Sequence, residues 1–363
     1  MKVIYVSSNG GIHDFRFLNK LEKDYEVLFL HYAANEIIDE IDKLENLEII
    51  SKKPAFKSFP LISETGHFKR VLNEFKPDIV HTGYVWQVGV LASLAGIHPH
   101  LSMPWGSDIL IEPDNSIIKK KLVKKVVNQC DHIQCDAEFV KQKIINDYGL
   151  DEDKITVFPW GIDLSLFKKF DRDAARAKLH IDNDKFVVVF NRYLEQVYGI
   201  NYLLEAFKIF AKDKEDVLLV MLSEGDLKNS VLKFITENKM EVKINLIGKV
   251  SNFELPEFLN AADIYVSSSL SDGTSLSLLE AMACGMGLVV TDVPAIREWV
   301  NEENGLIVER KNSPRFAKAM QTYYENRDLI KKHGERSSEI ASSRADWDKN
   351  YLKLKEIYTK LLS

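Results

Sequence analysis

Short runs of β-branched and aliphatic residues recur along the whole chain, and segments with a helical pattern separate them. The runs of the first half lie at residues 2–8, 25–32, 47–51, 78–83, 100–105, 132–137 and 154–160, and those of the second half at 185–192, 216–223, 243–249, 263–269 and 287–292. Helical patterns lie between them at 66–76, 116–130, 137–147, 201–212 and 276–284. Near-continuous apolar strands that alternate with helices are typical of parallel sheets covered on both faces. The sequence therefore predicts an α/β fold with doubly wound, Rossmann-like sheets.

The chain is long enough for two domains, because 363 residues with a hydrophobic content of 45% can form two sizeable cores. A charged stretch at 168–185 separates the two series of strands, and we place the boundary after Phe167. This gives an N-terminal domain at 1–167 and a C-terminal domain at 168–345. The last segment, about 346–363, has apolar residues at helical spacing, and we expect this helix to pack back on the N-terminal domain.

Composition excludes several classes of function. A net charge of −6 argues against broad nucleic-acid binding, which favours a basic domain. The three cysteines lack zinc-ligand spacing and are typical of reduced thiols. The first apolar run is too short for a signal peptide, and no run reaches the ~18 residues of a spanning helix. We therefore expect a cytoplasmic protein, with peripheral contact at a membrane surface left open.

Two acids, Asp272 and Glu280, lie eight positions apart around a polar turn, in the sequence SDGTSLSLLEAMACG that begins at Ser271. A strand pattern ends just before this turn and a helical pattern follows it, and ligands of open parallel sheets bind at such places. The unpaired N–H groups of a first helical turn suit a diphosphate, and Glu280 could accept hydrogen bonds from ribose hydroxyls. Local chemistry equally allows a second interpretation, in which Asp272, Thr274 and Ser275 cap the helix and Glu280 is solvated.

The segment 271–292, SDGTSLSLLEAMACGMGLVVTD, resembles the acid-x7-acid signature of family 4 of the retaining glycosyltransferases, which have the two-domain GT-B fold. Other landmarks of that family follow in the expected order over nearly the whole chain. They are SSNGGIHDFRFLNKL at 7–21, MPWGSDIL at 103–110, PWGIDLSLF at 159–167 and FNRYLEQVYGINYLLEAF at 190–207. The resemblance implies two Rossmann-like domains that face a central cleft.

By the same resemblance, Glu280 holds the donor ribose, Asp272 contacts the transferred sugar, and Arg192 neutralises the diphosphate as it leaves. An arginine suits that task because its planar fork binds phosphate oxygens in pairs and is always charged. The backbone amides of the turn are expected to meet the donor. The residues of this turn are Gly273, Thr274, Ser275 and Leu276.

On the other domain, Gly10 and Gly11 resemble the family's turn after the first strand and are expected to contact the donor. His13 follows that turn and is an acceptor-side candidate. Asp108 is the ionisable group best placed to orient an acceptor hydroxyl, although it could instead cap a helix. Two departures from the family are Tyr198, in place of a phosphate-binding lysine, and Trp105, in place of a histidine.

These features predict a glycosyltransferase that moves a sugar from a nucleotide diphosphate sugar to a glycan, lipid-linked or small-molecule hydroxyl with retention of configuration. No essential metal or other cofactor is expected, because the acidic clusters at 151–153, 171–173 and 182–184 lie in polar connections typical of turns. A non-catalytic nucleotide-sugar-binding subunit, or a sugar-nucleotide epimerase or phosphorylase of the same fold, remains an alternative.

The segment SIIKKKLVKKVVNQC, at 116–130, separates charge from apolar side chains. As a helix it would carry Lys120, Lys121, Lys124 and Lys125 on one face and an apolar face opposite. Such a face could dock on anionic lipid headgroups. The other interpretation is a helix that packs on the sheet and leaves its lysines in water.

Overall fold

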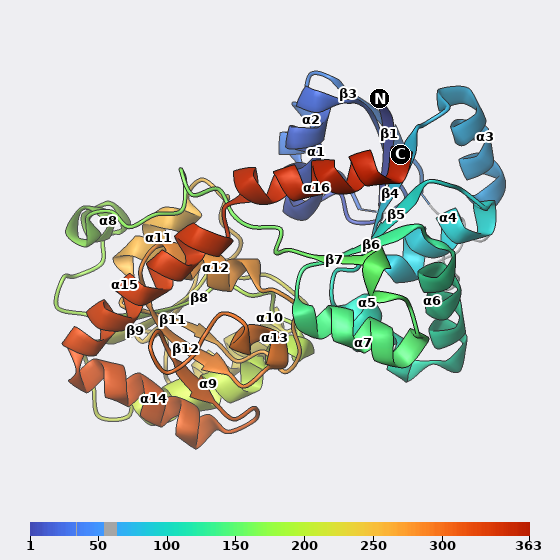
Figure 1. The fold of residues 1–363 in the computed structure, drawn as a ribbon. Coiled ribbons are helices and arrows are strands. Elements are labelled where there is room, and N and C mark those ends of the chain that lie inside the picture. Colours follow the sequence, from blue (N-terminus) through green and yellow to red (C-terminus); the bar gives the residue numbers. More distant parts are fainter. Residues whose placement is uncertain (34, 54–63) are drawn as a thin grey trace. The chain divides into compact units, whose positions relative to one another are not determined.

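The computed structural model describes residues 1–33, 35–53 and 64–363, which form two compact units (Figure 1). Unit 1 comprises Met1–Pro159 and Tyr351–Ser363, and unit 2 comprises Trp160–Asn350. Each unit has a parallel sheet with helices on its faces, as the alternation of apolar runs and helical patterns predicts. The predicted fold class, two doubly wound α/β domains, is confirmed.

The described residues of unit 1 form a seven-stranded parallel sheet in the order β3-β2-β1-β4-β5-β6-β7. The strands are β1 (Lys2–Ser7), β2 (Glu26–His31), β3 (Leu47–Ser51), β4 (Ile79–Gly83), β5 (His100–Met103), β6 (His132–Cys135) and β7 (Ile155–Val157). The helices are α1 (Ile12–Asp24), α2 (Asp39–Asp42), α3 (Thr65–Phe75), α4 (Val90–Ala95), α5 (Ser107–Leu110), α6 (Ile117–Gln129) and α7 (Glu138–Tyr148), with short helical turns η2 (Val85–Gly89), η3 (Glu112–Asn115) and η4 (Glu152–Lys154). The helix α16 (Trp347–Leu362) begins in unit 2 and belongs to unit 1 from Tyr351 on. Because the strand order reverses between β1 and β4, the loops after these two strands diverge there.

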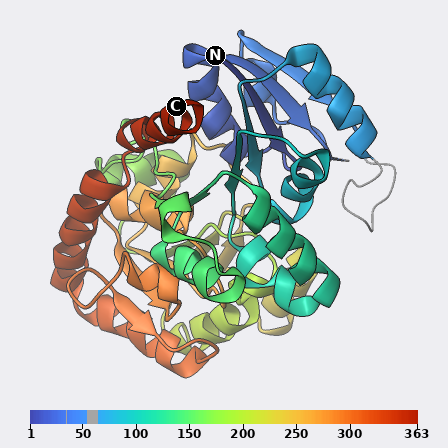
Figure 2. The same cartoon turned by 45° about the vertical axis from the view of Figure 1, so that its right-hand side comes forward.

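The two faces of the unit 1 sheet have different partners. On one face, Ile4 and Val6 pack with Phe68 of α3 and Leu91 of α4. On the other face, α1 and the C-terminal helix α16 cover the sheet, as Figure 1 and Figure 2 both show. The imidazole of His81 lies there, with its Nδ1 2.8 Å from the hydroxyl of Tyr358.

The C-terminal helix α16 is fixed to unit 1 by polar contacts as well. The hydroxyl of Tyr351 donates to Asp24 Oδ2 at 2.9 Å, and Lys355 Nζ lies 3.2 Å from the same oxygen. These contacts explain why the last turns of the chain belong to the unit formed by its first 159 residues.

Unit 2 has, in its described part, a six-stranded parallel sheet in the order β10-β9-β8-β11-β12-β13. The strands are β8 (Phe186–Phe190), β9 (Val217–Met221), β10 (Ile244–Leu246), β11 (Ile264–Ser267), β12 (Gly287–Thr291) and β13 (Leu306–Val308). The helices are α8 (Arg172–Leu179), α9 (Ile200–Phe210), α10 (Lys228–Glu237), α11 (Leu255–Ala261), α12 (Leu276–Ala283), α13 (Pro294–Arg297), α14 (Ser313–Glu325) and α15 (Arg327–Arg344), with the turn η5 (Gln196–Tyr198). Here the strand order reverses between β8 and β11.

The structure moves the domain boundary from the predicted position after Phe167 to Pro159 and Trp160. The segment after Trp160 belongs to unit 2 because the N–H of Ile162 donates to the carbonyl of Ala345 at 2.7 Å, and the N–H of Trp347 donates back to Ile162 at 3.1 Å. The sequence analysis also missed the edge strand β13, whose three residues are too few for a periodic pattern.

The buried imidazole of His81 makes the stability of the protein depend on pH. Burial lowers the pKa of His81 from 6.5 to about 3. Between these values the unfolded chain binds a proton that the folded protein does not, so the unfolding free energy falls as the pH falls, by up to about 1.4 kcal/mol per pH unit.

We predict that His81→Asn, which keeps a polar group near the position of Nδ1, weakens this dependence. Urea unfolding of both proteins between pH 7 and pH 4 measures it, and the wild type should show the steeper loss of stability towards acid. Equal slopes would contradict the prediction. The other buried histidines are common to both proteins and cancel in the comparison.

Candidate active site

An arginine and an aspartate meet where the strand order of unit 2 reverses. Arg192 follows β8 and Asp272 follows β11. The guanidinium Nη2 of Arg192 lies 2.8 and 3.0 Å from the two carboxylate oxygens of Asp272. Their side chains are only 11% and 12% exposed, so the ion pair is largely removed from water.

Hydroxyls and an aromatic ring complete the surroundings of Arg192. Its Nη1 donates to Ser275 Oγ at 2.7 Å and to Ser277 Oγ at 3.0 Å, and its guanidinium lies 4.3 Å from the centroid of the Tyr198 ring. Burial acts to lower the pKa of Arg192, but the carboxylate of Asp272 outweighs it and the pKa is raised. Within the described ranges, the buried Nε of Arg192 has no hydrogen-bond partner. The arginine is therefore charged and keeps one donor unused.

The amino end of α12 lies beside this arginine. Ser275 caps the helix, with its Oγ 3.4 Å from the N–H of Leu278, and the hydroxyl of Thr274 accepts from the Trp299 indole at 3.4 Å. The first turn of a helix carries a partial positive charge, so Arg192 and α12 direct positive charge to the same place. Asp272 makes an ion pair with Arg192, whereas the capping group is Ser275.

Glu280 lies one turn further along α12 and is only 6% exposed. The interpretation of Glu280 as a solvated helix residue is therefore wrong. A buried acid near a helix amino end is a suitable acceptor for ligand hydroxyls. Its contact with a ribose stays a prediction.

The loop that carries Tyr198 is tied to the end of β11. The hydroxyl of Ser268 donates to the carbonyl of Tyr198 at 2.7 Å, and the N–H of Leu270 donates to the carbonyl of Val197 at 2.7 Å. Gly199 has φ +64°, and a Cβ there would lie 2.2 Å from the Ser268 carbonyl oxygen. Only glycine fits this close approach, which fixes the Tyr198 ring over Arg192.

In unit 1, a buried acid organises the turn after β1. Asp14 Oδ2 accepts from the N–H of Gly10 at 2.7 Å and of Gly11 at 3.3 Å, and its Oδ1 accepts from the Tyr5 hydroxyl at 3.0 Å. Burial raises the pKa of Asp14 to about 6. Both glycine N–H groups are thus engaged within the protein, and the role of Gly10 and Gly11 in donor binding stays a prediction.

Asp108 does not have the exposure that a direct contact with an acceptor needs. Its side chain is completely buried, and its carboxylate accepts from the N–H of Val85 at 2.7 Å and of Trp105 at 3.0 Å. Burial raises its pKa to about 7. Through these bonds Asp108 fixes the loops after β4 and β5, and its role in orienting an acceptor hydroxyl stays a prediction.

His13 and Trp105 come together at the carboxyl ends of β1 and β5. Their ring centroids are 5.6 Å apart and their planes are nearly perpendicular. Gly83, the last residue of β4, leaves room for the indole, because a Cβ there would lie 3.1 Å from Trp105 Nε1. The two half-buried rings form an aromatic pair at this end of the unit 1 sheet, and His13 remains an acceptor-side candidate.

Sequence reasoning missed three hydroxyls that support the ion pair. Ser277 and Tyr265 are hydrogen-bonded to each other at 3.0 Å, and Ser223 Oγ donates to the carbonyl of Arg192 at 2.7 Å. Of these three residues, only Ser277 had a signal in the sequence, because it is a hydroxyl side chain within the mostly apolar run at 276–283.

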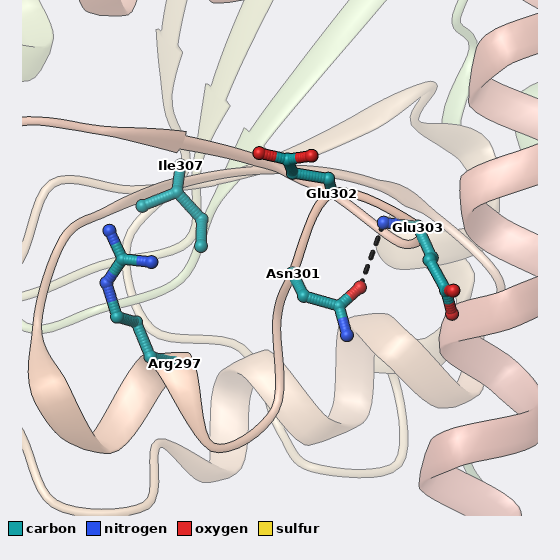
Figure 3. Close-up of a pocket in the computed structure, with 5 residues that line it drawn as sticks. All are labelled: Arg297, Asn301, Glu302, Glu303 and Ile307. Atoms are coloured by element: carbon teal, nitrogen blue, oxygen red, sulfur yellow. Dashed lines mark hydrogen bonds between the residues drawn. The ribbon is translucent and has the colours of Figure 1, made fainter.

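A separate hollow of unit 2 is lined by Arg297, Asn301, Glu302, Glu303 and Ile307 (Figure 3). It contains none of the predicted site residues. The residues described include no group of three or more His, Cys, Asp or Glu side chains that could hold a metal ion. Among the described helices, none combines the length and apolarity that crossing a membrane requires.

Two family profiles match the chain, one in each unit. The family described as Glycosyl transferases group 1 matches residues 171–341, and the family described as Glycosyl transferase 4-like matches residues 2–137. Together these matches cover most of the chain.

Relatives and a solved structure agree with these matches. The chain is 25% identical to an uncharacterized glycosyltransferase of Methanocaldococcus jannaschii, MJ1178, over 99% of this chain and 97% of that protein. It is 24% identical to the D-inositol 3-phosphate glycosyltransferase of Pseudarthrobacter chlorophenolicus, over 73% of this chain and 67% of that protein. The crystal structure of Anabaena HepE in complex with UDP-glucose aligns with a TM-score of 0.83 at 18% identity and covers 99% of this chain and 100% of that one. This likeness shows a common fold, the GT-B fold.

We predict that Gly199→Ala destabilises unit 2 more than Gly285→Ala does. Both residues have a left-handed backbone, which costs a residue with a Cβ about 1–2 kcal/mol. A Cβ at Gly285 meets only ordinary contacts at 3.4 Å, whereas Gly199→Ala must also displace the Ser268 carbonyl, at about 1–3 kcal/mol more. Urea unfolding of the two variants measures the difference. Equal losses would mean that the loop is not held as described.

Proposed function

Because two glycosyltransferase family models together match most of the chain and the fold is GT-B, we propose that the protein transfers a sugar from a nucleotide diphosphate sugar to an acceptor hydroxyl with retention of configuration. The observation that carries this proposal is the charged fork of Arg192, held at the amino end of α12 beside Asp272. The complex of HepE with UDP-glucose supports a UDP-sugar as the donor.

The donor binds at the amino end of α12, with its diphosphate against the helix N–H groups and Arg192. Glu280 accepts hydrogen bonds from the hydroxyls of the ribose. In the structure Asp272 occupies the fork of Arg192, so the diphosphate takes over part of that fork when it binds. Asp272 is then free to accept hydrogen bonds from hydroxyls of the transferred sugar.

Chemistry at this site depends on the charge that develops on the leaving diphosphate. The bond from the anomeric carbon to the phosphate oxygen breaks, its electron pair goes to the diphosphate, and the acceptor oxygen bonds to the anomeric carbon. Arg192 and the amino end of α12 stabilise the new negative charge, and such preorganised donors are usually the largest catalytic contribution. With this positive charge supplied by the protein, we propose that no metal ion is required.

The acceptor binds on the unit 1 surface formed by His13 and Trp105. Aromatic faces suit the apolar faces of sugars and polyols, and the imidazole supplies a hydrogen-bonding group. The relative named for inositol 3-phosphate supports a hydroxyl-rich acceptor. Asp108 contributes by fixing the N–H groups of Trp105 and Val85.

A second function is favoured by one observation. Tyr198 stands where the family resemblance expects a phosphate-binding lysine, and its ring adds no positive charge. A protein with this site could bind a nucleotide sugar without transferring it, as a non-catalytic subunit. Turnover of donor, measured as diphosphate release with and without acceptor, separates the two functions.

We predict that calorimetric titration with UDP, GDP and ADP detects binding of one diphosphate, and that binding persists after magnesium is chelated. Glu280→Gln should weaken this binding about 10- to 100-fold, because the charged carboxylate becomes a neutral amide with only one oxygen to accept from the ribose hydroxyls. Glu241→Gln, at an exposed glutamate of the same unit, is the control and should bind normally. Binding of none of the three diphosphates would contradict the proposed donor class.

We also predict that Arg192→Lys lowers kcat about 10²- to 10³-fold and changes KM for the donor much less, because the lysine keeps a charge but loses the fork that meets the leaving group. Steady-state assays of diphosphate release measure both constants. Wild-type turnover in this variant would refute the role of Arg192. A large rise in KM alone would assign it to donor binding only.

A further inference from the structure

The helix α6 of unit 1 presents two adjacent apolar side chains to water. Ile117 is 77% exposed and Ile118 is 57% exposed, at the amino end of the helix. The opposite side of α6 is buried through Val123, Val126 and Val127. The helix is therefore already fixed by its packed side, and the two isoleucines contribute nothing to that core.

Four lysines surround these isoleucines. Lys120, Lys121, Lys124 and Lys125 make no side-chain hydrogen bond or ion pair with any residue that the structure describes. The two acids that precede α6 in the sequence already have partners, since Glu112 pairs with Lys119 and Asp114 with Lys143. The positive charge of the four lysines is thus not neutralised by the protein.

The isoleucines and the four lysines share one side of the helix. At 100° per residue, all six fall within about 160° of its circumference. We call this surface the α6 face, formed by Ile117, Ile118, Lys120, Lys121, Lys124 and Lys125. Single exposed apolar residues are ordinary, but an adjacent pair among unpaired lysines has the composition of helices that lie at a membrane interface.

We propose that the α6 face docks unit 1 on an anionic lipid surface, with the lysines on headgroups and Ile117 and Ile118 inserted among them. Each lysine near such a surface adds attraction, and the isoleucines add burial of apolar area that a soluble polyanion cannot offer. The net charge of −6 disfavours nucleic acid as the partner.

Contacts inside unit 1 connect the helix α6 to the short helix α5, which contains Asp108. Lys119 Nζ bonds Glu112 at 2.8 Å, and Glu112 also accepts from the hydroxyl of Tyr84. The same hydroxyl lies 2.9 Å from Ser107 Oγ, in the short helix that contains Asp108. Docking would therefore hold the acceptor-side segment near lipids, a consequence that rests on the proposed function, whereas docking itself does not.

Sedimentation with vesicles tests the proposal. The full-length protein should bind vesicles of phosphatidylglycerol and phosphatidylcholine, with affinity that rises with the fraction of phosphatidylglycerol, and should not bind pure phosphatidylcholine. Replacement of the four lysines by glutamine should weaken binding by about 100-fold or more. The control replaces four exposed lysines of unit 2, Lys168, Lys169, Lys331 and Lys332, by glutamine and should bind like the wild type.

The double variant Ile117→Ser and Ile118→Ser distinguishes a membrane from a soluble polyanion. It should bind anionic vesicles at least about 5-fold more weakly but dextran sulfate as well as the wild type does. All substituted side chains are exposed or at the rim, and thermal unfolding checks that each variant is folded. Equal loss in the control variant, wild-type vesicle binding by the four-lysine variant, or no effect of the serines would overturn the proposal. Diphosphate titration with each variant shows that the donor site is unaffected.

Discussion

The reversal of strand order in each sheet is the constraint on which the candidate residues of each unit depend. The strand order of the unit 2 sheet reverses between β8 and β11, and in open parallel sheets the loops after such strands diverge at their carboxyl ends. Arg192 and Asp272 enter from these two loops and form their ion pair there. In unit 1 the same reversal separates the loops after β1 and β4, which carry Gly10 and Tyr84.

Burial of charge explains why the surroundings of Arg192 are so densely hydrogen-bonded. An arginine largely withdrawn from water needs an opposite charge and further acceptors, and removal of one partner would leave an uncompensated charge. Asp272, Ser275 and Ser277 supply these partners, and the Tyr198 ring covers the guanidinium face. A diphosphate can replace Asp272 at little electrostatic cost, because it brings an equal or larger negative charge to the same donors.

The sequence predicted the parts of this structure that local patterns determine. Strand runs, helix positions and the acid-containing turn before α12 all follow from periodicity and from cap residues. It could not predict the burial of Asp108, because the N–H of Val85 that binds it comes from a different loop, 23 residues away. Nor could it predict the pair of Arg192 with Asp272, which are 80 residues apart and meet only through the order of the strands. The same residue types cap helices and bind ligands, so the sequence alone left two interpretations of Asp272 open.

The two buried acids of unit 1 limit what that unit can contribute to catalysis. Asp14 and Asp108 each accept two backbone N–H groups, and both are completely buried. Neither carboxylate is therefore a ready base for an acceptor hydroxyl, and the residues around Trp105 offer shape and an imidazole instead. In the proposed transfer, the proton of the acceptor hydroxyl goes either to His13 or to the leaving diphosphate. An oxygen of the diphosphate becomes negatively charged and more basic as the bond to the sugar breaks. The leaving diphosphate is therefore better suited than His13 to take the proton, and catalysis depends mainly on Arg192 and the amino end of α12, which stabilise its charge.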